Sequence, residues 1–278
     1  MTPGALRRGA LTVALALAGA YLVLVLGLLA LQRRILFPAG ASRGLPTAPD
    51  LETLRVATPS GEVVALHLAG PSGAPTVVHF HGNGEQLADV VPLGRALRER
   101  GLSVVLAEYP GYGPMSAQAP SEGALLGAGR ALLTHLQRER GVSPAGTMLL
   151  GQSLGTGVAV ALAEEGRCGA LALVSPFTSL PAVAGFHYPF LPTRLLSDRL
   201  DSYTRAPRVP VPALVLHGDQ DDVVPFALGR QLAGAFADAR LVPLEGGHHN
   251  DLWGLFGARM LDELEGHARR MRYTPAGS

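Results

Sequence analysis

The chain has 278 residues, of which 47% are hydrophobic, and its formal net charge is only +1. This length suits one large domain or two small ones, and α/β folds of this length are commonly single domains, while the composition allows a sizeable core. The near-zero charge and the lack of a basic face argue against nucleic acid as a partner. Cys168 is the only cysteine, which excludes a disulfide framework and a thiolate metal site.

The first predicted element is a membrane anchor. Residues 9–31 carry no charge and consist mostly of Leu, Ala and Val, with Arg7-Arg8 before them and Arg33-Arg34 after them. As a helix they would cover about 34 Å, enough for a hydrocarbon core of about 30 Å. We therefore expect residues 1–34 to form an uncleaved single-pass anchor in a bacterial inner membrane, with the lipid bilayer as the partner of residues 9–31.

A cleaved signal peptide is the alternative, with Ala18-Gly19-Ala20 as the small-residue site. The apolar run continues to Leu31, which is longer than an ordinary signal needs, so we favour the anchor. A short basic N-terminal tail usually stays in the cytoplasm. This predicts that the globular domain lies outside the cytoplasm.

Residues 35–50 are rich in Pro, Gly and Ala and are interpreted as a connector to a domain over residues 51–278. In that domain, strand and helix patterns alternate after an initial hairpin. We expect strands at residues 52–58, 63–69, 76–80, 103–108, 147–150, 170–174, 213–216 and 240–243, and helices at 86–100, 121–140, 154–165, 227–237 and 251–272. Such alternation predicts an α/β fold with a mostly parallel central sheet and helices on both faces.

Residues 176–212 interrupt this alternation, because the segment is too long and too aromatic for an ordinary connection. We interpret it as a short cap-like insertion over a cleft, the alternative being a surface excursion that packs on itself. The aromatic candidates for a substrate pocket are Phe177, Phe186, Tyr188, Phe190 and Tyr109.

Gly151-Gln152-Ser153-Leu154-Gly155 is the most informative motif. It reads Gly-x-Ser-x-Gly and lies between a predicted strand and a predicted helix, which is the setting of a nucleophile elbow. Side chains at the two flanking positions would collide with the adjoining strand and helix, and glycine avoids this. The motif predicts that Ser153 is a nucleophile.

Other reactive residue types follow neighbouring strands, where ligands of parallel sheets bind. Residues 217–225 supply acids, and residues 246–251 supply histidines. A histidine can remove the serine proton near neutral pH, and a carboxylate can orient that histidine. The acid stays open between Asp219, Asp221 and Asp222, and the base between His248 and His249. Backbone N–H groups of Asn83 and Leu154 are expected to bind the oxyanion.

Several histidines fall near this same edge of the sheet, at positions 79, 81, 217, 248 and 249. No His-x-x-x-His pair supports a metal site among them, so we expect neither a metal nor a cofactor. His81 and His217 are interpreted as structural groups that bind loop backbone, and Tyr109 and Tyr112 as side chains that brace a turn.

The order Ser…Asp…His resembles that of the α/β-hydrolase superfamily. The chain is similar to its membrane-anchored serine hydrolases, the Bem46-like and alpha/beta-hydrolase-domain 13- and 17-like group, and to bacterial S33-like hydrolases. The motifs that carry this resemblance are residues 81–84, 109–113, 151–155, 175–179, 200–202, 217–225 and 247–251. The resemblance implies that Asp221 is the acid and His249 the base. The chain departs from the pattern of this group at Asn83-Gly84-Glu85, where Asn-Ala-Gly is usual, and at His248, where glycine is more frequent.

The expected function is hydrolysis of an ester or thioester bond of an acyl or lipid-like substrate through an acyl-serine. A serine aminopeptidase of the S33 type is the alternative enzyme. It would need acids for a substrate amine, and only Glu85 and Glu108 are near the site. A non-catalytic membrane scaffold that has kept the fold is the other alternative.

Overall fold

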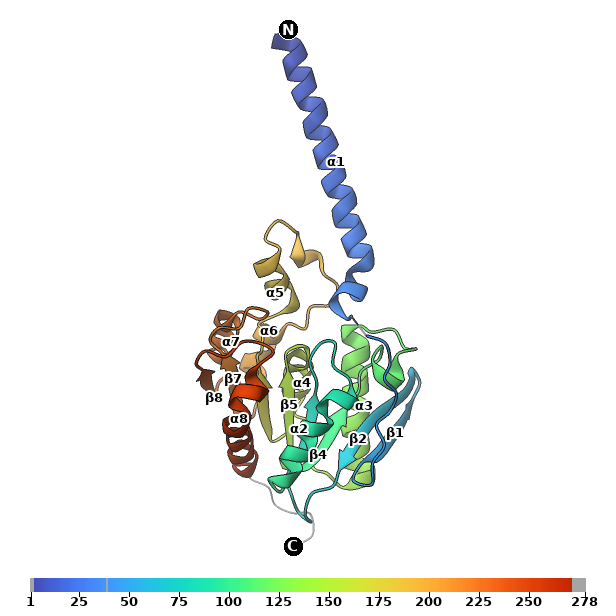
Figure 1. Ribbon diagram of the computed structural model, residues 1–278, viewed down its shortest axis with the longest axis vertical. Helices are drawn as coiled ribbons and strands as arrows, with labels where there is room; N and C mark the ends of the chain where they lie inside the picture. Colours follow the sequence, from blue (N-terminus) through green and yellow to red (C-terminus); the bar gives the residue numbers. More distant parts are fainter. Residues whose placement is uncertain (1–2, 39, 272–278) are drawn as a thin grey trace.

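The computed structural model describes residues 3–38 and 40–271, and its elements follow the predicted alternation of strands and helices (Figure 1). The strands are β1 (Glu52–Thr58), β2 (Gly61–Leu68), β3 (Thr76–Phe80), β4 (Ser103–Ala107), β5 (Thr147–Gln152), β6 (Ala170–Val174), β7 (Ala213–Gly218) and β8 (Ala239–Leu244). The helices are α1 (Pro3–Leu36), α2 (Leu87–Glu99), α3 (Glu122–Arg140), α4 (Leu154–Glu164), α5 (Leu180–His187), α6 (Ser202–Arg205), α7 (Phe226–Ala233) and α8 (Leu252–Arg269), with short 3-10 turns at 113–115, 144–146, 193–195 and 206–208.

The strands form one eight-stranded sheet in the order β1-β2-β4-β3-β5-β6-β7-β8. β1 and β2 form the predicted hairpin, β2 pairs with β4 in the antiparallel sense, and all further pairs are parallel. Every residue of β3 and β6 is buried, because parallel strands have helices over both faces. The expected α/β-hydrolase fold is confirmed.

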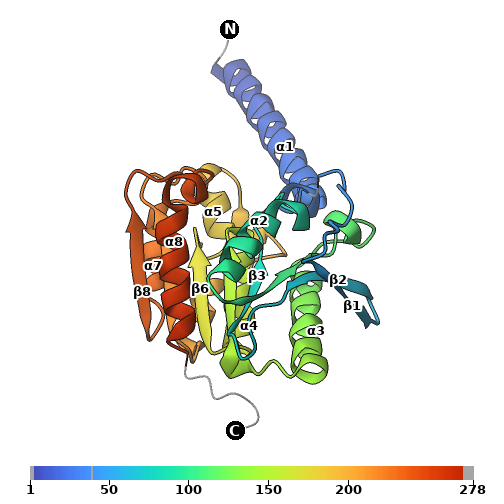
Figure 2. The ribbon, with the colours of Figure 1, turned by 60° about the horizontal axis from the view of Figure 1, so that its bottom comes forward.

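Helices cover the sheet from both sides (Figure 2). α2 and α8 contact each other on one face, and α3 and α4 contact each other on the opposite face. α4 lies over the centre of the sheet, and all its residues but Glu164 are buried. Since α4 begins directly after Ser153, this central packing fixes the position of the predicted nucleophile.

Two predicted helix ends can be compared with the structure. Ser121 caps α3, since its hydroxyl accepts the N–H of Ala124, and the helix ends at Gly141, which has a left-handed conformation. The last helix ends at Arg269 rather than at Arg272, which lies outside the described residues.

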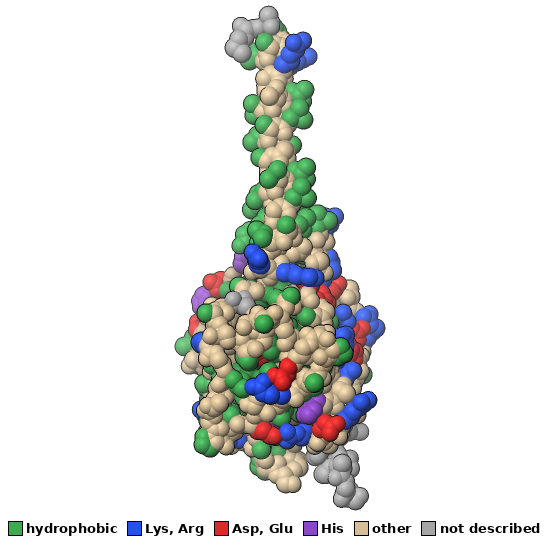
Figure 3. Space-filling model, turned by 90° about the vertical axis from the view of Figure 1, so that its right-hand side faces the viewer, with side chains coloured by type: hydrophobic (Ala, Val, Ile, Leu, Met, Phe, Trp, Pro, Cys, Tyr) green, Lys and Arg blue, Asp and Glu red, His purple; other side chains and the backbone are tan. Residues whose placement is uncertain are grey.

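α1 projects from the domain as a single long helix (Figure 1). Its best window has a mean hydropathy of 2.6, and it is long and apolar enough to cross a membrane. Apolar side chains extend along it, and basic side chains lie at both of its ends (Figure 3). An N-terminal signal sequence can pass the same test of length and hydropathy, so this test alone does not separate an anchor from a signal sequence.

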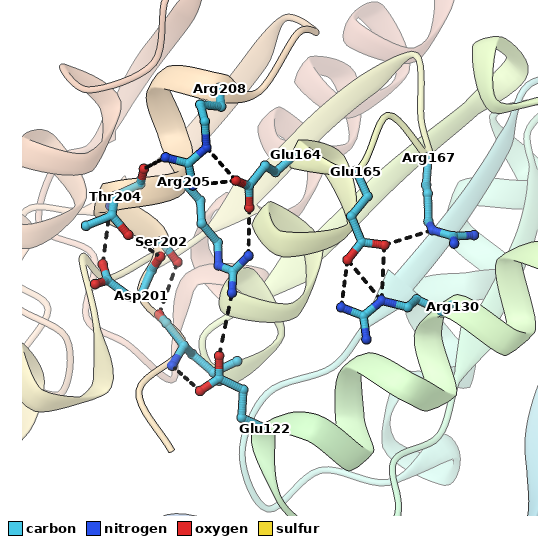
Figure 4. A network of polar contacts seen from close by, with 11 residues as sticks. Glu122, Arg130, Glu164, Glu165, Arg167, Asp201, Ser202, Thr204, Arg205 and Arg208 are labelled. Carbon is cyan, nitrogen blue, oxygen red and sulfur yellow. Dashed lines mark hydrogen bonds and ion pairs between the residues drawn. The ribbon is translucent and has the colours of Figure 1, made fainter. Parts of the chain in front are cut away.

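Between β6 and β7 the chain leaves the sheet and forms α5, a proline-rich turn and α6. Its return to the sheet is fixed by ion pairs, because Arg205 and Arg208 both contact Glu164 at the end of α4 (Figure 4). The first part of the segment, α5 and the turn after it, lies next to the base of α1 (Figure 1). We call residues 180–196 the cap.

Candidate active site

Ser153 stands on a sharp turn between β5 and α4. Its φ of 48° and ψ of −114° lie in a region that L-residues rarely adopt. A Cβ on Gly151 would come within 2.6 Å of the Gly155 carbonyl oxygen, and one on Gly155 within 2.0 Å of the Phe80 carbonyl oxygen. Both glycines of the motif are therefore required by close backbone approach, as the sequence predicts.

The structure brings Ser153, His249 and Asp221 together. The Nε2 atom of His249 lies 3.0 Å from the Oγ atom of Ser153, and its Nδ1 atom lies 2.8 Å from the Oδ2 atom of Asp221. A proton on Nδ1 is donated to the carboxylate, which leaves Nε2 free to accept the serine hydroxyl proton. This is the arrangement of a nucleophile, a base and an orienting acid.

The loop after β7 holds Asp221 firmly. Its side chain is fully buried, and its Oδ1 atom accepts the N–H groups of Val223 and Val224 at 3.0 and 2.7 Å. Burial alone raises the pKa of Asp221, but the hydrogen bonds from His217 and His249, the charge of His249 and the Val224 N–H outweigh it. The pKa of Asp221 is consequently well below its usual value, so the carboxyl stays ionised.

The competing acids and the competing histidine lie elsewhere. Asp219 accepts the N–H of Gly246 at 2.7 Å and thus joins two loops. The side chain of Asp222 is 76% exposed and faces His248 across 4.0 Å. The backbone N–H of His248 donates to Asp251, and its ring points to solvent. Of the alternatives left open by the sequence, His249 is the histidine that contacts Ser153, and Asp221 is the acid that contacts His249 at Nδ1.

The loop after β3 lies beside Ser153. A Cβ on Gly82 would be 3.5 Å from the Cβ of Ser153. Asn83 is fixed by two side-chain bonds, because its Oδ1 atom accepts the Tyr112 hydroxyl at 2.7 Å and its Nδ2 group donates to the Leu36 carbonyl at 2.9 Å. The backbone of this loop is thus held in place next to the nucleophile, and one of its contacts is the end of α1.

Comparison with known proteins agrees with this geometry. A profile of the serine hydrolase (FSH1) family matches residues 125–250, which include Ser153, Asp221 and His249. The chain is 42% identical over 200 residues to the uncharacterized protein Rv2307c of Mycobacterium tuberculosis, a match that covers 71% of this chain and 70% of the relative. The chain is a serine hydrolase of the α/β-hydrolase superfamily, in one family with Rv2307c.

More distant similarities agree with this assignment. Alpha/beta hydrolase domain-containing protein 17C of Mus musculus is 34% identical over 185 residues, which cover 66% of this chain and 56% of the mouse protein. The structure of the Pyrococcus furiosus esterase Pf2001 superimposes with a TM-score of 0.69 over 84% of this chain and 99% of the esterase. At 13% identity, that similarity concerns the fold alone.

A buried polar cluster supports the loop after β3. The Nδ1 atom of His81 donates to the Gly82 carbonyl at 2.9 Å, and its Nε2 atom lies 2.8 Å from the Oε1 atom of Glu108. The side chains of both His81 and Glu108 are inaccessible to solvent. Burial lowers the pKa of His81, but the hydrogen bond and the charge of Glu108 outweigh it and leave that pKa raised. Glu108 also accepts the N–H groups of Leu87 and Tyr109, and its side chain is closed off from solvent, so a substrate amine cannot reach it.

Two of the expected pocket aromatics are corrected by the structure. Phe177 and Tyr109 are 2% and 1% exposed and belong to the core. The hydroxyl of Tyr109 donates to the His81 carbonyl at 3.0 Å, which makes it a brace for the loop, the other role expected for it. The direction of an aromatic side chain at these two positions depends on packing that the sequence does not reveal.

The other three aromatics lie on the cap. Phe186, Tyr188 and Phe190 are between 53% and 63% exposed. Tyr188 and Phe190 line an apolar cavity between the cap and α1, whereas Phe186 does not line it.

A chain of hydrogen bonds that the sequence did not predict runs through Gln152, the residue before Ser153. The indole N–H of Trp253 donates to Gln152 at 2.7 Å, and the amide of Gln152 lies 3.5 Å from both carboxylate oxygens of Glu85. Glu85 in turn accepts the N–H of Gly82 at 2.6 Å. The departure from the family pattern at residues 83–85 is the signal that could have found it.

The other histidines are accounted for without a metal. Within residues 3–38 and 40–271, no three His, Cys, Asp or Glu side chains are grouped so as to hold an ion. His217 contacts the Val224 carbonyl at 2.9 Å, in agreement with the structural role expected for it. Burial, and next the charge of His81, lower the pKa of His79 to about 3, so this core histidine is neutral.

Proposed function

We propose that the chain is a membrane-anchored hydrolase that cleaves ester or thioester bonds of acyl or lipid-like substrates through an acyl-serine intermediate. The observation that carries this proposal is the unbroken pair of hydrogen bonds from Asp221 through His249 to Ser153. Similarity to alpha/beta hydrolase domain-containing protein 17C supports a place in the membrane-anchored group with Bem46-like members.

In the first half of the reaction, the Oγ atom of Ser153 attacks the carbonyl carbon while its proton passes to Nε2 of His249. Asp221 stabilises the imidazolium that forms. The N–H groups of Asn83 and Leu154 bind the oxyanion, and loss of one such donor typically costs about 10²–10³ in turnover. His249 then protonates the leaving alkoxide or thiolate, and the acyl group stays on Ser153.

In the second half, His249 takes a proton from water, and the resulting nucleophile attacks the acyl carbon. Collapse of this intermediate returns the proton to Ser153 and releases the carboxylic acid. No cofactor enters either half of the reaction.

The proposal also includes the arrangement of the whole chain. Residues 1–34 are an uncleaved anchor, 35–50 a connector and 51–278 the hydrolase domain, with residues 176–212 as a cap-like insertion. The anchor lies in a bacterial inner membrane, and the domain lies outside the cytoplasm. The apolar composition of α1 and its contacts with the folded domain support retention of the helix.

A fluorophosphonate probe tests the chemistry directly. We expect the wild type to be labelled covalently and Ser153→Ala to remain unlabelled. Equal labelling of both proteins would contradict the assignment of the nucleophile. A circular-dichroism spectrum of the variant, unchanged from the wild type, is the control for folding.

A panel of p-nitrophenyl esters beside aminoacyl-nitroanilides tests the substrate class. We expect hydrolysis of the esters only, because the Glu108 side chain is inaccessible to solvent and only Glu85 remains for a substrate amine. Turnover of the nitroanilides would favour the aminopeptidase. If neither the esters nor the nitroanilides are hydrolysed and the probe does not label the protein, the non-catalytic scaffold is favoured.

A further inference from the structure

An apolar cavity of about 470 Å³ lies between the second half of α1 and the cap. Its walls include Leu24, Leu28 and Leu36 of α1 and Ala184 of α5. Polar side chains are few, with Gln32, Thr193 and the hydroxyl end of Tyr188 among those that line it. The volume is within the usual range for small-molecule sites, and the lining suits a hydrocarbon chain.

α1 runs beside the cap and the residue that follows it. The Tyr21 hydroxyl donates to the Phe190 carbonyl at 2.7 Å, and the N–H of Ser197, directly after the cap, donates to Gln32 at 2.9 Å. From Tyr21 to Gln32 a helix rises about 17 Å. If α1 crosses a bilayer with Arg33 at its surface, the cap must extend into the same leaflet, because it follows the helix that far.

The cap is built for contact with lipid. Phe186 and Phe190 are 61% and 63% exposed, which would be unfavourable in water. Pro189 and Pro192 have no N–H to leave unpaired. From the end of α5 onward, the N–H groups of Tyr188, Leu191, Thr193, Leu195 and Leu196 donate to carbonyls of the cap. A backbone in hydrocarbon must satisfy its polar groups internally, and this segment largely does so.

Both walls of the cavity are attached to the loops of the catalytic site. On one side, the Leu36 carbonyl accepts the Asn83 amide, and Asn83 adjoins Gly82, which faces Ser153. On the other side, His187 at the end of α5 bonds the Val223 carbonyl at 2.8 Å, two residues from Asp221. Each wall of the cavity is therefore hydrogen-bonded to a loop of the catalytic site.

From these contacts we propose that the cavity between α1 and the cap is the acyl-chain site of a substrate that stays in the bilayer while it reacts. The cap dips into the leaflet beside α1, and the chain enters sideways from lipid. The ester or thioester group then reaches Ser153 at the foot of α1. Arg33, which pairs with Asp198 at 2.8 Å, and Arg34 mark the headgroup level. This inference rests on the proposed esterase function and adds where its substrate comes from.

The first test is the chain-length profile of the full-length protein in vesicles. Leu28→Trp narrows the cavity from the α1 wall, and Ala184→Phe narrows it from the cap wall. We expect long-chain esters to lose about tenfold in kcat/KM for every two methylene groups excluded, while acetate hydrolysis is unchanged.

Leu26→Trp is the matched control, because Leu26 belongs to the same helix, is 56% exposed and does not line the cavity. It should keep the wild-type profile. If Leu28→Trp and Ala184→Phe hydrolyse long and short esters in the wild-type ratio, the acyl-chain site is wrong, although the esterase function stands.

The second test is independent of catalysis. Tyr188→Trp is placed in phosphatidylcholine vesicles with brominated acyl chains, and its emission is compared with that in unbrominated vesicles. We expect bromine to quench this tryptophan, because the cavity opens to lipid. The wild type, with Trp253 alone, gives the background.

Arg138→Trp is the control for this measurement. α3 begins next to Asp198, near the base of α1, and extends away from it for 19 residues, so Arg138 lies at the far end of the domain. It should not be quenched. If Tyr188→Trp behaves like Arg138→Trp, the cavity does not open into the bilayer. If the wild type cleaves no ester, the proposed function fails, and quenching alone decides whether the cavity meets lipid.

Discussion

The catalytic edge of the sheet and the cap beside α1 differ in how far their functional side chains are buried and paired. At the catalytic edge, Asp221 is buried, and every oxygen of its carboxylate has a partner from the chain itself. On the cap, Phe186 and Phe190 remain more than half exposed, and no side chain within residues 3–38 and 40–271 covers them fully. The first region is complete without a partner, whereas the second is an apolar surface that lacks one.

The two regions also differ in how they are encoded. The loops of the catalytic edge follow neighbouring parallel strands, so the sheet brings them together once its order is set. The cap meets α1 through contacts between residues more than 160 positions apart, such as Tyr21 with Phe190. We therefore expect substitutions at the catalytic edge to lower turnover strongly for every ester. Substitutions at the cap should have smaller effects on kcat/KM that depend on the substrate.

The largest effect is expected for Asp221→Asn. This change keeps the shape of the side chain but removes the charge that stabilises the His249 imidazolium and orients its ring. We expect turnover of a short p-nitrophenyl ester to fall by about 10⁴. Steady-state kinetics of the purified full-length protein measures it.

Asp222→Asn is the matched control, one residue away. Because the Asp222 side chain is 76% exposed, its replacement should leave turnover within about twofold of the wild type. A comparable loss in both variants would mean that the acid has been assigned to the wrong residue or that the whole loop is disturbed.

A large part of this region was predictable from sequence. The Gly-x-Ser-x-Gly motif predicts a sharp turn at Ser153, and its two glycines are needed because backbone atoms approach them closely. The predicted parallel strands place the three loops at one edge of the sheet. The choice of Asp221 over Asp222 was not predictable from spacing, because adjacent residues point in different directions and only the packed loop shows which one is buried. The resemblance to the superfamily supplied that choice.

The cap region was much less predictable. The aromatic and proline composition of residues 176–212 marks this segment as unusual. It does not reveal that Phe177 enters the core while Phe190 remains exposed. The salt bridge between Arg33 and Asp198 joins an arginine predicted to flank the anchor with a segment 165 residues later. No local pattern encodes such a contact, because it depends on where the fold places two distant segments.

The pH dependence of stability should also separate Asp221 from its neighbour. The pKa of Asp221 is lowered in the folded state, so its ionised form stabilises the fold above the ordinary carboxyl pKa near 4. That contribution is lost as the pH falls below this value and the carboxyl becomes protonated. We expect the wild type to unfold at a higher denaturant concentration than Asp221→Asn at pH 6, and this difference to shrink by pH 3.5.

Denaturant titrations in detergent micelles, followed by circular dichroism, measure the two midpoints at each pH. Asp222→Asn again provides the reference, since it removes an acid from the same loop without removing a buried charge. A difference between wild type and Asp221→Asn that stays constant from pH 6 to pH 3.5 would contradict the assigned pKa shift.

The smallest effect is expected where the two regions meet. His187 ends α5 and bonds the Val223 carbonyl at 2.8 Å, which links the cap to the loop of Asp221. His187→Ala removes this exposed hydrogen bond, for which a net contribution of about 0.5–1.5 kcal/mol is typical. If the cap wall guides the acyl chain, kcat/KM for long-chain esters should fall by about two- to tenfold, and acetate hydrolysis should not change. An equal fall for both esters would mean that His187 stabilises the Asp221 loop, and the cap would then act on the catalytic edge itself rather than on the substrate.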